Sequence, residues 1–136
     1  MSRIQALELV TIVVLAHHDR QHLLQRALLY YRSFGAPDKV LVLDSSASVA
    51  DDSALRSLLA DPSVRYRRYP NDRLPIRKLA HGLGEVLTPY AVLCADDDFT
   101  SLHGIADCIG FLEDHPDYVA AQGLVYQHVL RPSGRV

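Results

Sequence analysis

Four mostly apolar stretches alternate along the chain with segments of helical periodicity. They cover residues 9–16, 39–43, 64–69 and 90–95. The first, second and fourth are short, continuous and largely aliphatic, which is typical of strands buried on both faces of a parallel sheet. The third alternates loosely between arginines and other residues, so we expect it near the edge of the sheet.

The intervening segments carry helix signals. Asp19 can cap a first helix, which Gly35 ends and Pro37 prevents from returning. Its apolar residues follow helical spacing: Leu24, Ala27, Leu28 and Tyr31. We expect further helices over residues 51–59 and 77–87, and a last one that begins after Thr100 or Ser101 and ends at residue 115. Residues 118–121 are expected to form a fifth strand, and residues 124–130 to be extended.

This alternation predicts an α/β fold with a mostly parallel sheet flanked by helices on both faces and joined by right-handed crossovers. A chain of 136 residues has the size of a single domain, residues 1–136, with its own core. No repeat, linker or low-complexity segment divides it.

Composition narrows the classes of function. A net charge of −2 without a Lys/Arg run gives no field that would attract nucleic acid. The longest apolar run is far shorter than the ~20 residues of a membrane span, and no signal peptide is recognisable. Cys94 and Cys108 are most simply core residues of a protein in a reducing compartment. We therefore expect a cytoplasmic protein without a transmembrane segment.

Polar residues follow three of the predicted strands, and in a parallel sheet these strand ends meet at one edge, where ligands bind. The three segments are His17-His18-Asp19-Arg20, Asp44-Ser45-Ser46 and Asp96-Asp97-Asp98. Two carboxylates about 4 Å apart repel by roughly 4 kcal/mol at an effective dielectric near 20. The three consecutive aspartates therefore indicate either a site for Mg²⁺ or Mn²⁺, shared with a diphosphate, or a solvated acidic turn. Their position alone leaves both readings open.

Neither a dinucleotide-binding G-x-G-x-x-G after the first strand nor a P-loop occurs in the chain. Phosphates would then be neutralised by a metal and by basic side chains. The candidates are Arg73, Arg77 and Lys78.

The order of these segments resembles family-2 glycosyltransferases of the GT-A fold, over roughly residues 11–123. The resemblance rests on Arg20 after the first strand, Asp44 after the second, Gly82 in the following helix and the Asp-x-Asp motif of Asp96-Asp97-Asp98. It implies a Rossmann-like domain that binds a nucleoside-diphosphate sugar, with a uridine diphosphate sugar favoured. By resemblance, Asp44 contacts the nucleotide base, Asp96 faces the ribose and the metal, and Asp98 binds the Mn²⁺ or Mg²⁺ ion that bridges the diphosphate.

The donor-binding residues expected on this basis are His17, His18, Arg20, Asp44, Arg77, Lys78, Asp96 and Asp97. The resemblance also implies metal-assisted transfer of the sugar to a carbohydrate or other hydroxyl acceptor, with inversion. The acceptor-binding half of such enzymes has no counterpart here, so we expect the general base to lie outside this chain.

Two other interpretations stay open. The chain could be a module that binds a nucleotide or a divalent cation without catalysis, or a receiver-like phospho-acceptor domain, which its late aspartates fit less well. An uncovered sheet edge would also favour pairing of two copies into a homo-oligomer.

Overall fold

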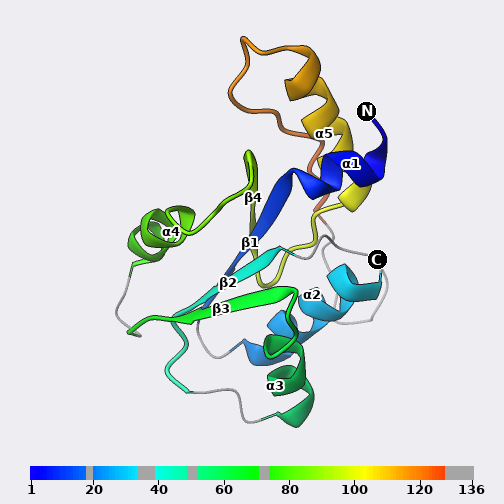
Figure 1. The fold of residues 1–136 in the computed structure, drawn as a ribbon. Coiled ribbons are helices and arrows are strands. Elements are labelled where there is room, and N and C mark those ends of the chain that lie inside the picture. Colours follow the sequence, from blue (N-terminus) through cyan, green and yellow to red (C-terminus); the bar gives the residue numbers. More distant parts are fainter. Residues whose placement is uncertain (18–19, 34–38, 49–51, 71–73, 128–136) are drawn as a thin grey trace.

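A computed structural model describes residues 1–17, 20–33, 39–48, 52–70 and 74–127 (Figure 1). In chain order the elements are α1 (Arg3–Glu8), β1 (Val10–Ala16), α2 (Gln21–Ser33), β2 (Val40–Asp44), α3 (Ser53–Leu59), β3 (Val64–Arg68), α4 (Pro75–Leu83), β4 (Tyr90–Ala95) and α5 (Leu102–Asp114).

The predicted α/β fold with helices on both faces of a parallel sheet is confirmed. The four strands lie in the order β3-β2-β1-β4 and all pair in parallel. β1 is interior, with Val13 beside Leu41 of β2 on one side and Leu93 of β4 on the other. This Rossmann-like order aligns the carboxyl ends of all four strands at one edge of the sheet.

The larger core lies on the face covered by α2 and α3, and buried residues of α1 and α5, which lie together near the start of β1, belong to the same core (Figure 1). Val10, Ile12 and Val14 of β1 point to this face because strand side chains alternate. The expected apolar stripe of α2 is confirmed, since the buried residues of that helix are Leu24, Ala27, Leu28 and Tyr31.

Of the described helices, α4 is the one that covers the opposite face (Figure 1). Its core is small, with Val13, Leu41 and Leu43 fully buried beneath the helix. Gly82 makes this packing possible, because a Cβ added there would lie 2.4 Å from Leu43 Cδ1. The glycine thus allows α4 to approach β2 closely, and it brings Lys78, one helical turn earlier, under the ends of the strands.

The prediction of a fifth strand was wrong. Residues 118–121 form no strand; they follow α5 as irregular, exposed chain, and residues 124–127 likewise lie in no strand. Residues 128–130 of that expected segment, and the expected turn signals Asp19, Gly35 and Pro37, are outside the described residues. β4 is consequently an edge strand rather than one buried on both faces, and Leu93 is 52% exposed. No described strand pairs with its outer edge, and α4 lies over β2 instead.

The helices differ from the expectation in two respects. Helix α1 was not predicted; the reciprocal hydrogen bonds of Ser2 and Gln5 cap it, and Ala6 is its one buried residue. Helix α4 starts with Pro75 at its first turn and ends at Leu83. No described helix has the length and apolarity needed to cross a membrane.

Candidate functional site

The polar segments after β1, β2 and β4 converge at the carboxyl edge of the sheet. The backbone N–H of His17 donates to Asp96 Oδ2 at 3.3 Å, which joins the ends of β1 and β4. His17 Nδ1 lies 3.0 Å from both the carbonyl oxygen and the Oγ of Ser45, which joins the ends of β1 and β2. The structure therefore brings together the three strand ends that the sequence singled out.

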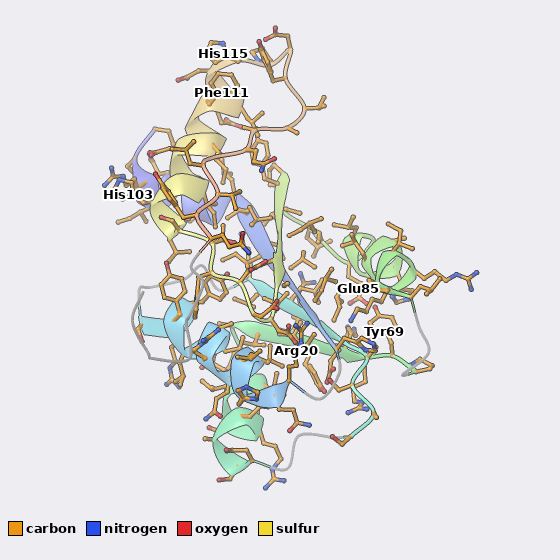
Figure 2. The ribbon with its side chains drawn as sticks, turned by 180° about the vertical axis from the view of Figure 1, so that it is seen from behind. Arg20, Tyr69, Glu85, His103, Phe111 and His115 are labelled. Atoms are coloured by element: carbon orange, nitrogen blue, oxygen red, sulfur yellow. The ribbon has the colours of Figure 1, made fainter. Side chains whose placement is uncertain are left out.

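Asp96 is the most deeply buried carboxylate of this cluster, with 1% of the residue exposed. Arg20 Nη2 lies 2.7 Å from Asp96 Oδ1, yet this ion pair lacks hydrogen-bond alignment and the oxygen has no hydrogen bond. Arg20 Nη1 also donates to Asp97 Oδ2 at 2.8 Å. Burial raises the pKa of Asp96 above its usual range, and the guanidinium of Arg20 opposes this shift. Arg20, labelled in Figure 2, is thus the counter-ion of two neighbouring aspartates.

Asp44 ends β2 and is also buried. Its Oδ2 accepts a hydrogen bond from Tyr66 Oη at 2.7 Å, and its Oδ1 accepts one from the backbone of Ser46 at 2.8 Å. Burial and the hydrogen bond to Asp44 raise the pKa of Tyr66 to about 12. A carboxylate offers about four lone-pair positions, so these two bonds orient Asp44 and leave acceptor capacity for a ligand.

Lys78 is buried beneath the strand ends, with 1% of the residue exposed. Its ammonium donates to the carbonyl oxygen of Ala16 and to Ser45 Oγ, the latter at 3.0 Å. Burial lowers the pKa of Lys78, while the charges of Asp44 and Asp96 act in the opposite direction. The ammonium therefore joins the ends of β1 and β2 from below, and it lies far less open to a phosphate than the sequence suggested.

The remaining predicted residues take more peripheral positions. Asp97 and Asp98 are exposed in the turn after β4, where the N–H of Asp98 donates to Ala95 O at 3.2 Å. Arg77 is exposed on α4. His18 and Arg73 lie outside the described residues.

The carboxylates at the strand ends are the groups of the site that could take part in holding a cation. The described residues contain no group of three or more His, Cys, Asp or Glu side chains arranged to enclose a metal. A magnesium ion that also binds phosphates needs only one or two carboxylates from the protein. Asp96 Oδ1, buried and without a hydrogen bond, and the exposed carboxylate of Asp98 are the oxygens that suit this role.

Two functional contacts were missed from the sequence. Tyr66 pairs with Val42 in the parallel register, and its hydroxyl reaches the end of β2. Arg68 Nη2 donates to Ser46 O at 2.7 Å and organises the loop after β2. The signal available in the sequence was the pair of predicted strands, residues 39–43 and 64–69. Pairing them in parallel would have placed the side chains of the second strand near the end of the first.

Comparison of the chain with protein-family models, with curated proteins and with solved structures gives no match. The geometry and charge of the strand ends are therefore the basis for a functional proposal.

Proposed function

We propose that this chain is the donor-binding portion of a glycosyltransferase. It binds a nucleoside-diphosphate sugar, preferentially of uridine, together with Mn²⁺ or Mg²⁺ at the carboxyl edge of the sheet. The observation that carries the proposal is the pair of buried carboxylates, Asp44 and Asp96, at the ends of the two strands that flank β1. A Rossmann-like sheet binds its ligands in this position, where strand ends converge.

Each residue has a role that follows from its surroundings. Asp44, held by Tyr66 and Ser46, presents a fixed acceptor for a base N–H, as in the glycosyltransferases that the motifs resemble. Asp96 faces the ribose and the metal, and Asp98 supplies a further carboxylate. The cation, when bound, neutralises the departing diphosphate as a Lewis acid.

Arg20 has two possible partners in this proposal. Its guanidinium forms ion pairs with Asp96 and Asp97. Asp96 would hold the cation, and the guanidinium of Arg20, which can form two parallel hydrogen bonds, would suit an oxygen of the diphosphate. Transfer of the sugar to an acceptor hydroxyl also requires a general base.

The order of the strands counts against the receiver-like alternative. Receiver domains have the flavodoxin-like order 2-1-3-4-5, in which the first strand lies between the second and the third. Here β1 lies between β2 and β4, and β3 is at the edge beyond β2.

The test is calorimetric titration of uridine diphosphate and its sugars into the protein, with and without Mn²⁺. We expect binding that depends on the metal, and we expect Asp98→Ala to abolish that dependence. Asp107→Ala is the matched control, because Asp107 is an exposed aspartate of α5 away from the strand ends.

Equal binding by Asp98→Ala and by Asp107→Ala would contradict the metal role. Absence of nucleotide binding by the wild-type chain, with metal present, would refute the donor site. Binding without sugar transfer, once an acceptor and the rest of an enzyme are supplied, would instead establish a non-catalytic nucleotide-binding module.

A further inference from the structure

A cavity of about 280 Å³ lies at the opposite end of the sheet, near the amino ends of the strands. It is lined by Thr11, Lys39, Arg65, Leu87 and Thr88. Arg65 pairs with Leu41, which belongs to the small core beneath α4, so the cavity opens on that face of the sheet. Its residues are separate from those of the candidate donor site.

Two cations that have no carboxylate partner among the described residues line this cavity. Lys39 Nζ donates to the backbone carbonyl of Glu8, and Arg65 Nη1 donates to the backbone carbonyl of Glu85 at 2.7 Å. Within the described ranges, no ion pair involves either side chain. The carboxylate of Glu85, labelled in Figure 2, is bound instead to Arg67 at 2.9 Å. The cavity therefore has a positive local charge in a chain whose net charge is −2.

Among the side chains that line the cavity, those of Lys39 and Arg65 have hydrogen-bond donors to spare. An ammonium has three N–H donors and a guanidinium five, and each group uses one in the bonds above. The threonine hydroxyls are already engaged: Thr88 donates to Tyr90 O at 2.9 Å, and Thr11 Oγ1 lies 2.7 Å from Thr88 Oγ1. Since the proton of Thr88 is used on Tyr90, the proton of Thr11 goes to Thr88. The two cations are thus the groups that can hold an anion.

The other residues that line the cavity indicate which chemical group the anion has besides its negative charge. Thr11 is 1% exposed and lies at the bottom of the cavity, while Leu87 is 89% exposed and offers apolar surface at its rim. The volume of the cavity is just below the range of about 300–1,000 Å³ that small-ligand pockets span. It has room for more than a single inorganic ion.

We propose that this cavity binds a small organic oxyanion, whose negative group lies between Lys39 and Arg65 and whose apolar part lies against Leu87. Phosphate monoesters and carboxylates share this chemistry. The site is independent of the proposed donor site, from which it is separated by the length of the strands.

The test uses phenyl phosphate, benzoate and inorganic phosphate as probes, with binding followed by NMR of the backbone amides. We expect saturable shifts at Thr11, Lys39 and Thr88 with phenyl phosphate or benzoate, and weaker binding of inorganic phosphate. Arg65→Gln should weaken binding about tenfold, as expected for the loss of a charge-assisted hydrogen bond. Lys39→Gln should act in the same direction.

Arg56→Gln is the matched control, since Arg56 is an exposed arginine of α3 on the other face of the sheet. Failure of all three probes to give saturable shifts would overturn the proposal. So would equal weakening by Arg56→Gln and Arg65→Gln, or shifts confined to the strand ends around Asp44 and Asp96. Asp98→Ala leaves probe binding unchanged if the proposal is right, so loss of the donor site and loss of this site are distinguishable.

Discussion

Replacement of Gly82 by alanine tests the close contact between α4 and the sheet. The new Cβ would lie 2.4 Å from Leu43 Cδ1 and 2.7 Å from Leu43 Cδ2. Carbon atoms pack best at about 3.5–4.0 Å, so either the leucine methyl groups or the helix must move by roughly 1 Å. Leu43 is fully buried, so a shift of its methyl groups must be accommodated within the small core beneath α4.

The cost of this overlap is set against a gain in helix propensity. Overpacking of a well-filled core costs typically about 1–3 kcal/mol. Alanine is favoured over glycine within a helix by up to about 1 kcal/mol. We therefore expect Gly82→Ala to lower the free energy of unfolding by about 1 kcal/mol.

Gly110→Ala is the matched control, because a Cβ on Gly110 of α5 meets no atom within 4 Å. This variant should gain about 0.5–1 kcal/mol. The difference between the two variants cancels much of the propensity effect and isolates a steric cost of about 1–3 kcal/mol. Urea unfolding followed by circular dichroism measures both free energies. If Gly82→Ala were as stable as Gly110→Ala, the close approach of α4 to β2 would be refuted.

Three further predictions concern the candidate site and the sheet edge. In the wild type, ionisation of Asp96 should lower the free energy of unfolding as the pH rises above about 4. Asp96→Asn should remove this pH dependence. The raised pKa of Asp96 means that the folded protein favours the protonated form, and urea unfolding at several pH values measures this slope. Tyr66→Phe should cost about 1.5–3 kcal/mol through the lost bond to a carboxylate. The raised pKa of Tyr66 predicts a loss of wild-type stability as the pH rises from 10.0 to about 12, and Tyr66→Phe should abolish this loss. Ultraviolet titration of the tyrosines would detect the raised pKa directly. Leu93→Lys places a charge on the exposed edge strand, and we expect any dimer seen by light scattering to dissociate, with a change of less than about 0.5 kcal/mol in monomer stability.

Periodicity was sufficient to predict most of the fold. The spacing of Leu24, Ala27, Leu28 and Tyr31 identified the buried face of α2, because a helix with one apolar stripe has one way to meet a sheet. Helix α1 gave no such signal, since it buries Ala6 alone. Residues 118–121 have the composition of a strand, but composition cannot supply a pairing partner.

The expected parallel topology of the sheet predicted more of the site than motif matching did. Asp44 and Asp96 were expected at one edge because strands of a parallel sheet end together, and both are there. The burial of Lys78 was not predictable, since it depends on how closely α4 packs against β2. Arg77, its neighbour in sequence, lies on the exposed side of the same helix. Adjacent basic residues of a helix point in different directions, and the sequence does not say which one faces the sheet.

The position of β1 between β2 and β4 has a consequence for the order in which the sheet can form. The β1–β2 pair places Val13 beside Leu41, and the β1–β4 pair places Val13 beside Leu93. The chain between the paired residues is therefore far longer for β1–β4 than for β1–β2. Closing the longer loop costs more chain entropy, so the second pairing is expected to form late. On a ribosome, one edge of β1 stays unpaired until β4 has left the exit tunnel, and the nascent protein exposes an uncharged strand edge during that interval.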